Sequence, residues 1–309
     1  MPKIGCLGKI VIAFIVVLVL VVVGGMLLGL PRPEVHLPPN DVFHIGSFAI
    51  TNTMLASWLT MLVLTGLLYF GTRRMKLVPS GLQNFLEAIL EWLLNFVEGA
   101  AGRVNGRRFF YLVAAIFLFV ITNAYLSLLP GFNFIGYGEQ GTYETAFFGE
   151  QSSFVVHSSL LRLANTDINL PLALAIFSFV FVEFWGIRAL GFRHYMGKFI
   201  KLGSLVNAFK SLLRGRIIDF ITGVVEAFIG IIEGITELVR LVSFTFRLFG
   251  NMTAGEVLLL MMAFLLPLVA AMPFYGLELL IGFIQALIFA GLTLGFAMIA
   301  TIPHEPEHA

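Results

Sequence analysis

The stretch TFRLFGNMTAGE, residues 245–256, places an arginine, an asparagine and a glutamate in the middle of a strongly apolar chain. A charged side chain at the centre of a lipid bilayer costs about 2.5–3.5 kcal/mol on insertion scales. A charge kept there therefore faces a partner, a cavity or water. The composition agrees with a membrane location, because 59% of the 309 residues are hydrophobic and only 12% are charged. We expect an all-α polytopic membrane protein.

Long apolar runs on both sides of this stretch predict about five to six membrane helices. The first run, 10–30, is interpreted as an uncleaved first helix, and a cleaved signal peptide is the alternative. The segment 80–101 carries glutamates at near-helical spacing among bulky apolar residues, which predicts an amphipathic helix at the membrane interface. The other predicted spans cover about 50–71, 109–130, 168–187, 217–252 and 256–302.

The last two spans are expected to be long helices that pack as a hairpin and tilt steeply from the membrane normal. At 1.5 Å per residue the segment 217–252 would span about 54 Å, against a hydrocarbon core of about 30 Å. A tilt removes this mismatch. In such a hairpin we expect Gln285 to approach Arg247, with both side chains facing away from the core of the chain.

The basic residues alternate between the two sides of the predicted spans, which indicates the orientation. The end with Lys3 and Lys9 and the basic stretch 188–216 are expected in the cytoplasm, together with the C-terminus. The acidic loop 131–168 is then external. The expected parts are an N-terminal apolar segment with an external Pro-rich loop (1–49), a membrane domain (50–302) and a cytoplasmic tail (303–309).

The segment 233–254, placed on a helix with 3.6 residues per turn, has a polar stripe opposite a bulky apolar face. Arg247 has no acidic residue three or four positions away, so its counter-charge must come from another helix or another subunit. Arg240 could snorkel to the interface or attract carboxylates, so helical geometry does not separate the two arginines. The stripe consists of Glu233, Thr236, Arg240, Ser243, Arg247, Asn251 and Ala254.

The residues RLFGNMTAGE (247–256) resemble the signature of subunit a of F-type ATP synthases. The resemblance covers about 50–302. It implies an Fo stator subunit with two aqueous half-channels, which carry protons to and from the carboxyls of a c-subunit ring and couple ion flow to rotation and ATP synthesis. Four further segments resemble this family in the same order: ITNAYLSLLPG (121–131), NTDINLPLALAIF (165–177), IIEGITELVRLVSFTFRLFGN (231–251) and IGFIQALIFAGLTLGFAMIA (281–300).

The resemblance also implies roles for individual residues. Arg247 matches the essential arginine of the family; its guanidinium keeps its proton and lowers the pKa of a passing carboxyl. The half-channel residues implied by the resemblance are Asn251, Glu256, Glu278, Gln285, Glu233, Asp167 and Asn169.

Two pairs of these residues have a second possible interpretation. Glu256 and Glu278 are expected as a pair in the outer half-channel, and the alternative is an internal hydrogen-bonded pair. Asp167 and Asn169 are expected at the same entrance, and the alternative is a helix N-cap. Glu233 matches a position in the cytoplasmic half-channel.

The implied subunit is non-catalytic, and the sequence contains no GxxxxGK[ST] nucleotide-binding loop. No cofactor, metal or nucleic acid is expected. The expected partners are the c-subunit ring, the b subunits of the peripheral stalk, the remaining ATP synthase subunits and the lipid bilayer. The resemblance places the chain in the plasma membrane of a bacterium.

Three other functions stay open. A secondary ion transporter would normally show internal repeats, and none is seen. A structural membrane scaffold would not explain Arg247. A Na⁺-coupled version of the same subunit remains possible, because the c subunit would largely set the choice of ion.

Overall fold

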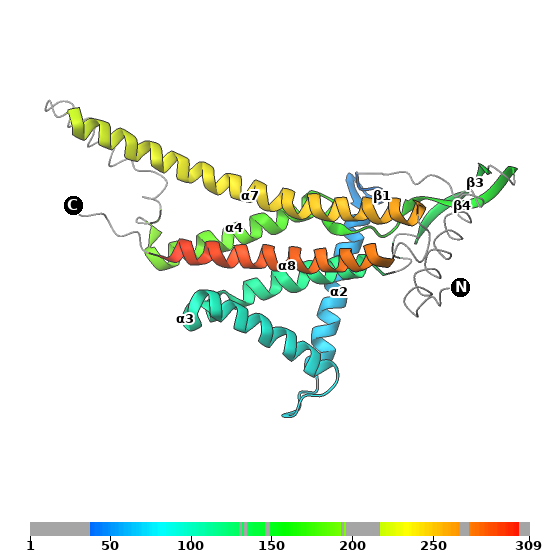
Figure 1. The fold of residues 1–309 in the computed structure, drawn as a ribbon, viewed down its shortest axis with the longest axis horizontal. Coiled ribbons are helices and arrows are strands. Elements are labelled where there is room, and N and C mark those ends of the chain that lie inside the picture. Colours follow the sequence, from blue (N-terminus) through cyan, green and yellow to red (C-terminus); the bar gives the residue numbers. More distant parts are fainter. Residues whose placement is uncertain are drawn as a thin grey trace, which may run out of the picture. The chain divides into compact units, whose positions relative to one another are not determined.

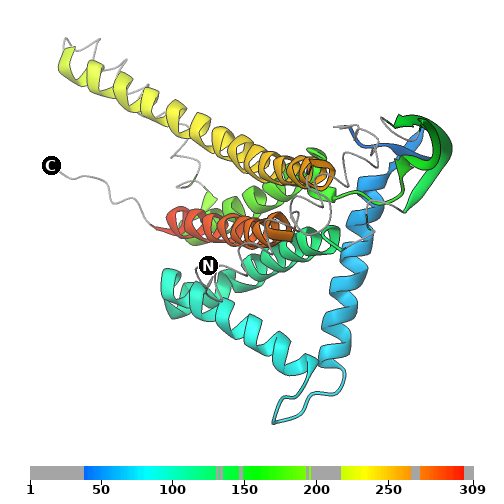
Figure 2. The same cartoon turned by 45° about the vertical axis from the view of Figure 1, so that its right-hand side comes forward.

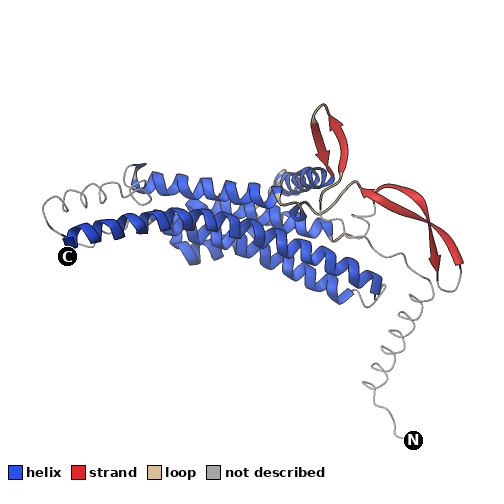
Figure 3. Ribbon diagram, turned by 90° about the horizontal axis from the view of Figure 1, so that it is seen from above, coloured by secondary structure: helices blue, strands red, loops and turns tan. Residues whose placement is uncertain are grey.

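The computed structural model describes residues 38–129, 132, 135–145, 149–192, 195, 217–265 and 272–302. Most of this part of the chain is helical, with two short antiparallel strand pairs (Figures 1 and 3). The expected first helix at 10–30 and the tail 303–309 lie outside the described residues. The five long helices are α2 (Asn52–Thr72), α3 (Leu82–Ser127), α4 (Asn169–Leu190), α7 (Ile217–Leu265) and α8 (Met272–Thr301).

These helices confirm the expected all-α membrane fold. Within the described ranges four of them are long and apolar enough to cross a bilayer, namely α2, α3, α4 and α8. The fifth, α7, carries charged residues along its whole length, from Asp219 to Glu256. It is therefore the helix whose polar groups most need partners.

The chain folds into two compact units, and α3, α7 and α8 each contribute one part to each unit. The first unit draws its described residues from Met1–Phe70, Leu118–Asp167 and Leu248–Ala286. The second unit draws on Gly71–Phe117, Ile168–Arg247 and Leu287–Ala309.

In the first unit, Asn52 joins the start of α2 to two strand pairs. Its side chain accepts a hydrogen bond from the backbone N–H of Asn40 (3.2 Å) and donates to the carbonyl of Ser159 (3.2 Å). Asn40 precedes the hairpin of β1 (Asp41–Ile45) and β2 (Phe48–Thr51), and Ser159 ends β4. Figure 2 shows these strands at the N-terminal end of α2.

The segment 131–168, which the sequence predicted to be a loop, contains secondary structure. It contains β3 (Gly136–Thr145) and β4 (Gly149–Ser159), which pair antiparallel from Gly136 opposite Ser159 to Thr145 opposite Gly149. Threonine, tyrosine and valine in these segments favour strands despite the several glycines.

In the second unit, Phe244 of α7 packs against α8 with ring centroids 5.0 Å from Phe289 and 5.5 Å from Phe296. The hydroxyls of Ser178 and Thr293 lie 2.8 Å apart and join α4 to α8. All these groups except Phe296 are buried. The helices of this unit are thus held by aromatic packing and a satisfied hydroxyl pair.

The helix expected at 80–101 is present as the first part of α3, and Gly102 separates it from the rest of α3. Its place at the membrane interface stays a prediction. Gly102 has φ 75° and ψ 162°, a conformation that is essentially restricted to glycine. The backbone therefore breaks between the glutamate-bearing segment and the basic residues 103–108, which precede the continuous apolar run.

The substitution Gly102→Ala is expected to destabilise the protein by about 1–3 kcal/mol, because alanine at this φ and ψ is strained. Thermal unfolding of the detergent-purified protein measures the effect. Gly99→Ala is the matched control: Gly99 is helical, with no atom within 4 Å of an added Cβ. We expect Gly99→Ala to be neutral or slightly stabilising. Equal unfolding temperatures for the two variants would contradict the role of the break.

The predicted boundary between the last two spans was wrong. We expected the first to end near residue 252, but α7 continues through Gly255 to Leu265. Gly255 stays helical because its missing side chain makes room for a carboxyl of α8. Pro273 lies in the first turn of α8, where a missing N–H costs nothing. The 49 residues of α7 extend over about 74 Å, and its tilt in the membrane stays a prediction.

Candidate functional site

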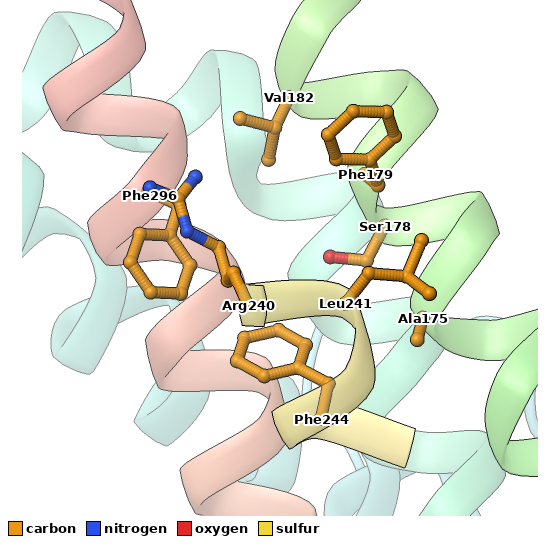
Figure 4. Close-up of a pocket in the computed structure, with 8 residues that line it drawn as sticks. All are labelled: Ala175, Ser178, Phe179, Val182, Arg240, Leu241, Phe244 and Phe296. Carbon is orange, nitrogen blue, oxygen red and sulfur yellow. The ribbon is translucent and has the colours of Figure 1, made fainter. Parts of the chain in front are cut away.

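Arg240 is satisfied by groups of the second unit. Its guanidinium forms an ion pair with buried Glu237, one turn earlier on α7. The same group stacks on Phe296 of α8, with 3.7 Å between Cζ and the ring centroid. Figure 4 shows this stacking beside Ser178 and Val182 of α4. A paired and stacked guanidinium needs no partner outside the chain.

Tyr195 lies beside this ion pair and is almost fully buried. Its ring occupies the space over Gly186, where an added Cβ would lie 2.4 Å from Cε2. Burial raises the pKa of the Tyr195 hydroxyl, and the charge of Glu183 and a hydrogen bond to it raise the pKa further. The phenol therefore stays neutral and serves as a hydrogen-bonding group.

Glu233 lies one turn before Glu237 on α7 and is half-buried. Its Oε2 is buried and has no hydrogen-bond partner within the part of the chain that the structure describes. A buried carboxyl oxygen in this state requires water or another molecule. The arrangement agrees with the role that the sequence gave to Glu233, which stays a prediction.

Arg247 differs from Arg240 in its surroundings. Its Cζ lies 5.9 Å from the ring centroid of Phe244, and among the described residues it forms no ion pair and no hydrogen bond. Asn251 follows one helical turn later and is exposed. The half-buried charge of Arg247 therefore lacks a counter-charge in this part of the chain, as the sequence predicted.

The first unit contains a buried ion pair that the sequence reasoning missed. Arg162, in the loop before α4, donates from Nε to Oε1 of Glu256 (3.1 Å) and from Nη2 to Oε2 (3.1 Å). Its Nη1 donates to the carbonyl of Pro38 (3.1 Å). Nothing in the sequence joins Arg162 to Glu256, which lies 94 positions later.

Glu278 of α8 is buried in the same unit, and its carboxyl lies against α7 at Gly255. A Cβ on Gly255 would approach both carboxyl oxygens to 2.1–2.2 Å. Glu278 thus contacts Gly255, the residue that precedes Glu256. No hydrogen bond joins the carboxyls of Glu256 and Glu278 among the described residues. The alternative of an internal hydrogen-bonded pair needs a proton on one of the two carboxyls, and it stays open.

Asp167 is buried and accepts a hydrogen bond from the hydroxyl of Thr53 (2.9 Å). The N-cap of α4 is Ile168, which makes no side-chain capping bond, and Asn169 is the exposed first residue of the helix. The alternative that Asp167 or Asn169 caps the helix stays open, because Asp167 has the extended backbone (φ −100°, ψ 124°) that is typical of a residue just before a helix. The channel role of both residues stays a prediction.

Gln285 is buried in the first unit, although we expected it to face outward. The small residues Gly282 and Ala286 share its helix face and are also buried. An added Cβ on Gly282 would lie 3.0 Å from the Cβ of Ala124 in α3. This close helix packing covers the neighbouring Gln285. Its approach to Arg247 stays a prediction.

Several buried polar atoms of the first unit lack a hydrogen-bond partner within the described ranges. Buried polar atoms are nearly always hydrogen-bonded in proteins, to water where no protein group is available. These atoms therefore need water or another molecule as hydrogen-bond partners. They are Asn123 Oδ1, Asn165 Oδ1 and Nδ2, Thr253 Oγ1 and Glu278 Oε2.

Comparison with known proteins gives a consistent set of relatives. The sequence model of the family described as ATP synthase A chain matches residues 54–298. The chain is 31% identical over 253 residues to the ATP synthase subunit a of Solidesulfovibrio magneticus, covering 81% of this chain and 83% of the relative. The corresponding subunit of Gloeobacter violaceus is 30% identical over 83% and 86%. That of Moorella thermoacetica is 26% identical over 84% and 95%.

Proposed function

We propose a specific translocation path from the premise that this chain belongs to the ATP synthase A chain family. The chain is accordingly a multi-pass membrane subunit of the ATP synthase complex, with the subunit a role in proton transport. In our proposal it forms two aqueous half-channels. Protons pass through them to and from the carboxyls of a rotating c-subunit ring.

A single observation carries this proposal: among the described residues Arg247 has no counter-charge, and its helix bears a partly buried carboxyl on either side of it. Glu233 lies about 21 Å before Arg247 along α7, and Glu256 lies about 14 Å after it. Both neighbours sit among buried polar groups. Two separate half-channels require that a fixed charge interrupts the path of the protons between them.

Arg247 acts on a ring carboxyl through its permanent charge. A guanidinium does not release its proton in a protein. At about 4 Å and an effective dielectric constant near 20, its attraction for a carboxylate is about 4 kcal/mol. This attraction favours loss of the proton from a carboxyl that stays neutral in lipid. The same charge prevents protons from passing directly between the half-channels.

The remaining site residues divide between the two half-channels. Glu278, Asp167 and Asn169 belong to the outer one, together with the polar side chain of Asn251. Glu233 belongs to the cytoplasmic one. Gln285 provides a polar group near the arginine.

The proposed setting is the plasma membrane of a bacterium, with both termini in the cytoplasm. The basic stretch 188–216 then lies inside, as the positive-inside rule requires. The b subunits of the peripheral stalk hold the chain against rotation. ATP chemistry takes place on other subunits, so this chain is non-catalytic. A secondary transporter would not co-purify with a proteolipid ring, which separates the two functions in one experiment.

Cysteine labelling tests the two half-channels. In a Cys6→Ser background, Glu278→Cys is expected to react with a small water-soluble thiol reagent added from the outside, and Glu233→Cys with the same reagent added from the cytoplasmic side. Leu248→Cys is the control, because Leu248 is buried among apolar groups and should react from neither side. Labelling of positions 233 and 278 from the same side would contradict the proposal.

A further inference from the structure

The two carboxyls near the C-terminal part of α7 have different surroundings. Glu256 is bound by Arg162 through Nε to both oxygens (3.1 and 3.3 Å) and through Nη2 to Oε2 (3.1 Å). Both side chains are largely buried, at 10% and 19% exposure. Two nitrogens of one guanidinium therefore fix the plane and the position of the Glu256 carboxylate.

Glu278 lacks such a partner. Its carboxyl lies against the backbone of α7 at Gly255, and its Oε2 has no hydrogen-bond partner among the described residues. Its side chain therefore has an oxygen available to water. Among the described residues, the Glu256 carboxylate is thus bound to a cation and the Glu278 carboxyl is not.

We propose that Arg162 is a positioning residue that neutralises Glu256 and makes it a structural anchor, so that Glu278 alone takes up protons in this part of the chain. The inference rests on the proposed function and refines its outer half-channel. A proton on Glu256 would remove the negative charge from a largely buried ion pair, which is unfavourable. Glu278 can gain or lose a proton without breaking an ion pair.

The contact of Arg162 with Pro38 extends this role. Its Nη1 donates to the Pro38 carbonyl, so one side chain joins the segment before β1, the loop before α4 and α7. All three segments belong to the first unit. The anchor therefore fixes the position of Glu256 and of the adjacent Gly255. Because the Glu278 carboxyl packs against Gly255, the anchor also fixes the place where that carboxyl lies.

The test is a charge-removal cycle in the assembled complex. Passive proton flux is measured in vesicles stripped of the catalytic sector, for Arg162→Gln, Glu256→Gln and the double variant. We expect each single variant to lower the flux at least about tenfold, because each removes one partner of a largely buried ion pair. The double variant should recover to within about threefold of the original chain, because no charge remains. Arg162→Lys, which keeps the charge but loses the fork, should fall between.

Two comparisons distinguish the anchor from a general structural effect. Glu278→Gln should abolish the flux, and Arg162→Gln should not restore it. Arg107→Gln removes a cation from an exposed pair with Glu98 and should leave the flux unchanged. Flux is compared at equal amounts of assembled complex. If a single variant does not assemble, thermal unfolding of the detergent-solubilised protein replaces flux, and the double variant must unfold at a higher temperature than either single variant.

A double variant no better than Glu256→Gln would overturn the inference, because Glu256 itself would then carry protons. Single variants that conduct like the original chain would overturn it as well. Neither result bears on Arg247, whose substitution tests the proposed function separately.

Discussion

Arg247→Ala is expected to abolish ATP synthesis driven by ion flow while the complex still assembles. The substitution removes an attraction of about 4 kcal/mol for the ring carboxylate, which corresponds to roughly a thousandfold in equilibrium. It removes no ion pair within the described chain, so the fold should tolerate it. ATP synthesis in energised membrane vesicles measures the effect. Arg247→Lys should fail too, because lysine lacks the planar fork and can lose its proton when buried.

Arg240→Ala is the matched control, because both arginines lie on the same stripe of α7. Arg240 already has a partner in Glu237 and stacks on Phe296, so its loss should leave measurable coupling. It should lower stability instead, since the Glu237 carboxylate stays behind in a buried place. If Arg240→Ala abolished coupling and Arg247→Ala did not, the wrong arginine would have been assigned.

Glu278→Gln should have the second largest effect, a loss of proton flux of about a hundredfold or more. A positioned acid–base group typically contributes 10²–10⁴-fold to proton transfer. Glutamine keeps the shape of the side chain against Gly255 but cannot carry a proton. Quenching of a pH-sensitive dye in stripped vesicles measures the flux.

Glu278→Asp is the control for this prediction. It keeps the carboxyl but shortens the reach, so it should retain part of the flux. Equal flux for Glu278→Gln and the original chain would exclude this carboxyl from the path.

The sequence predicted the helices because their signals are local. The apolar runs are long enough to span a bilayer, and the stripe of α7 follows from the helical period alone. The choice of Arg247 over Arg240 came from the motif, since both lie on that stripe. The structure adds the physical reason, because Glu237 and Phe296 satisfy Arg240.

The ion pair of Arg162 and Glu256 was not predictable in this way. Its two residues come from a loop and a helix with no shared period, and only tertiary packing brings them together. Burial of Gln285 was missed for a similar reason: it depends on the close contact of Gly282 with Ala124. The end of α7 was misplaced near residue 252, whereas the helix continues through Gly255 to Leu265.

The unbroken course of α7 restricts how the length of this chain can change. One residue inserted between Glu233 and Glu256 would turn everything beyond it by about 100° and move it by about 1.5 Å. Glu256, and Arg247 where it follows the insertion, would then no longer have their present orientation relative to Glu233. The connection between Thr145 of β3 and Gly149 of β4 has no such restriction, because added residues there shift no residue along a helix. We therefore expect the protein to tolerate insertions and deletions between β3 and β4 but not within α7.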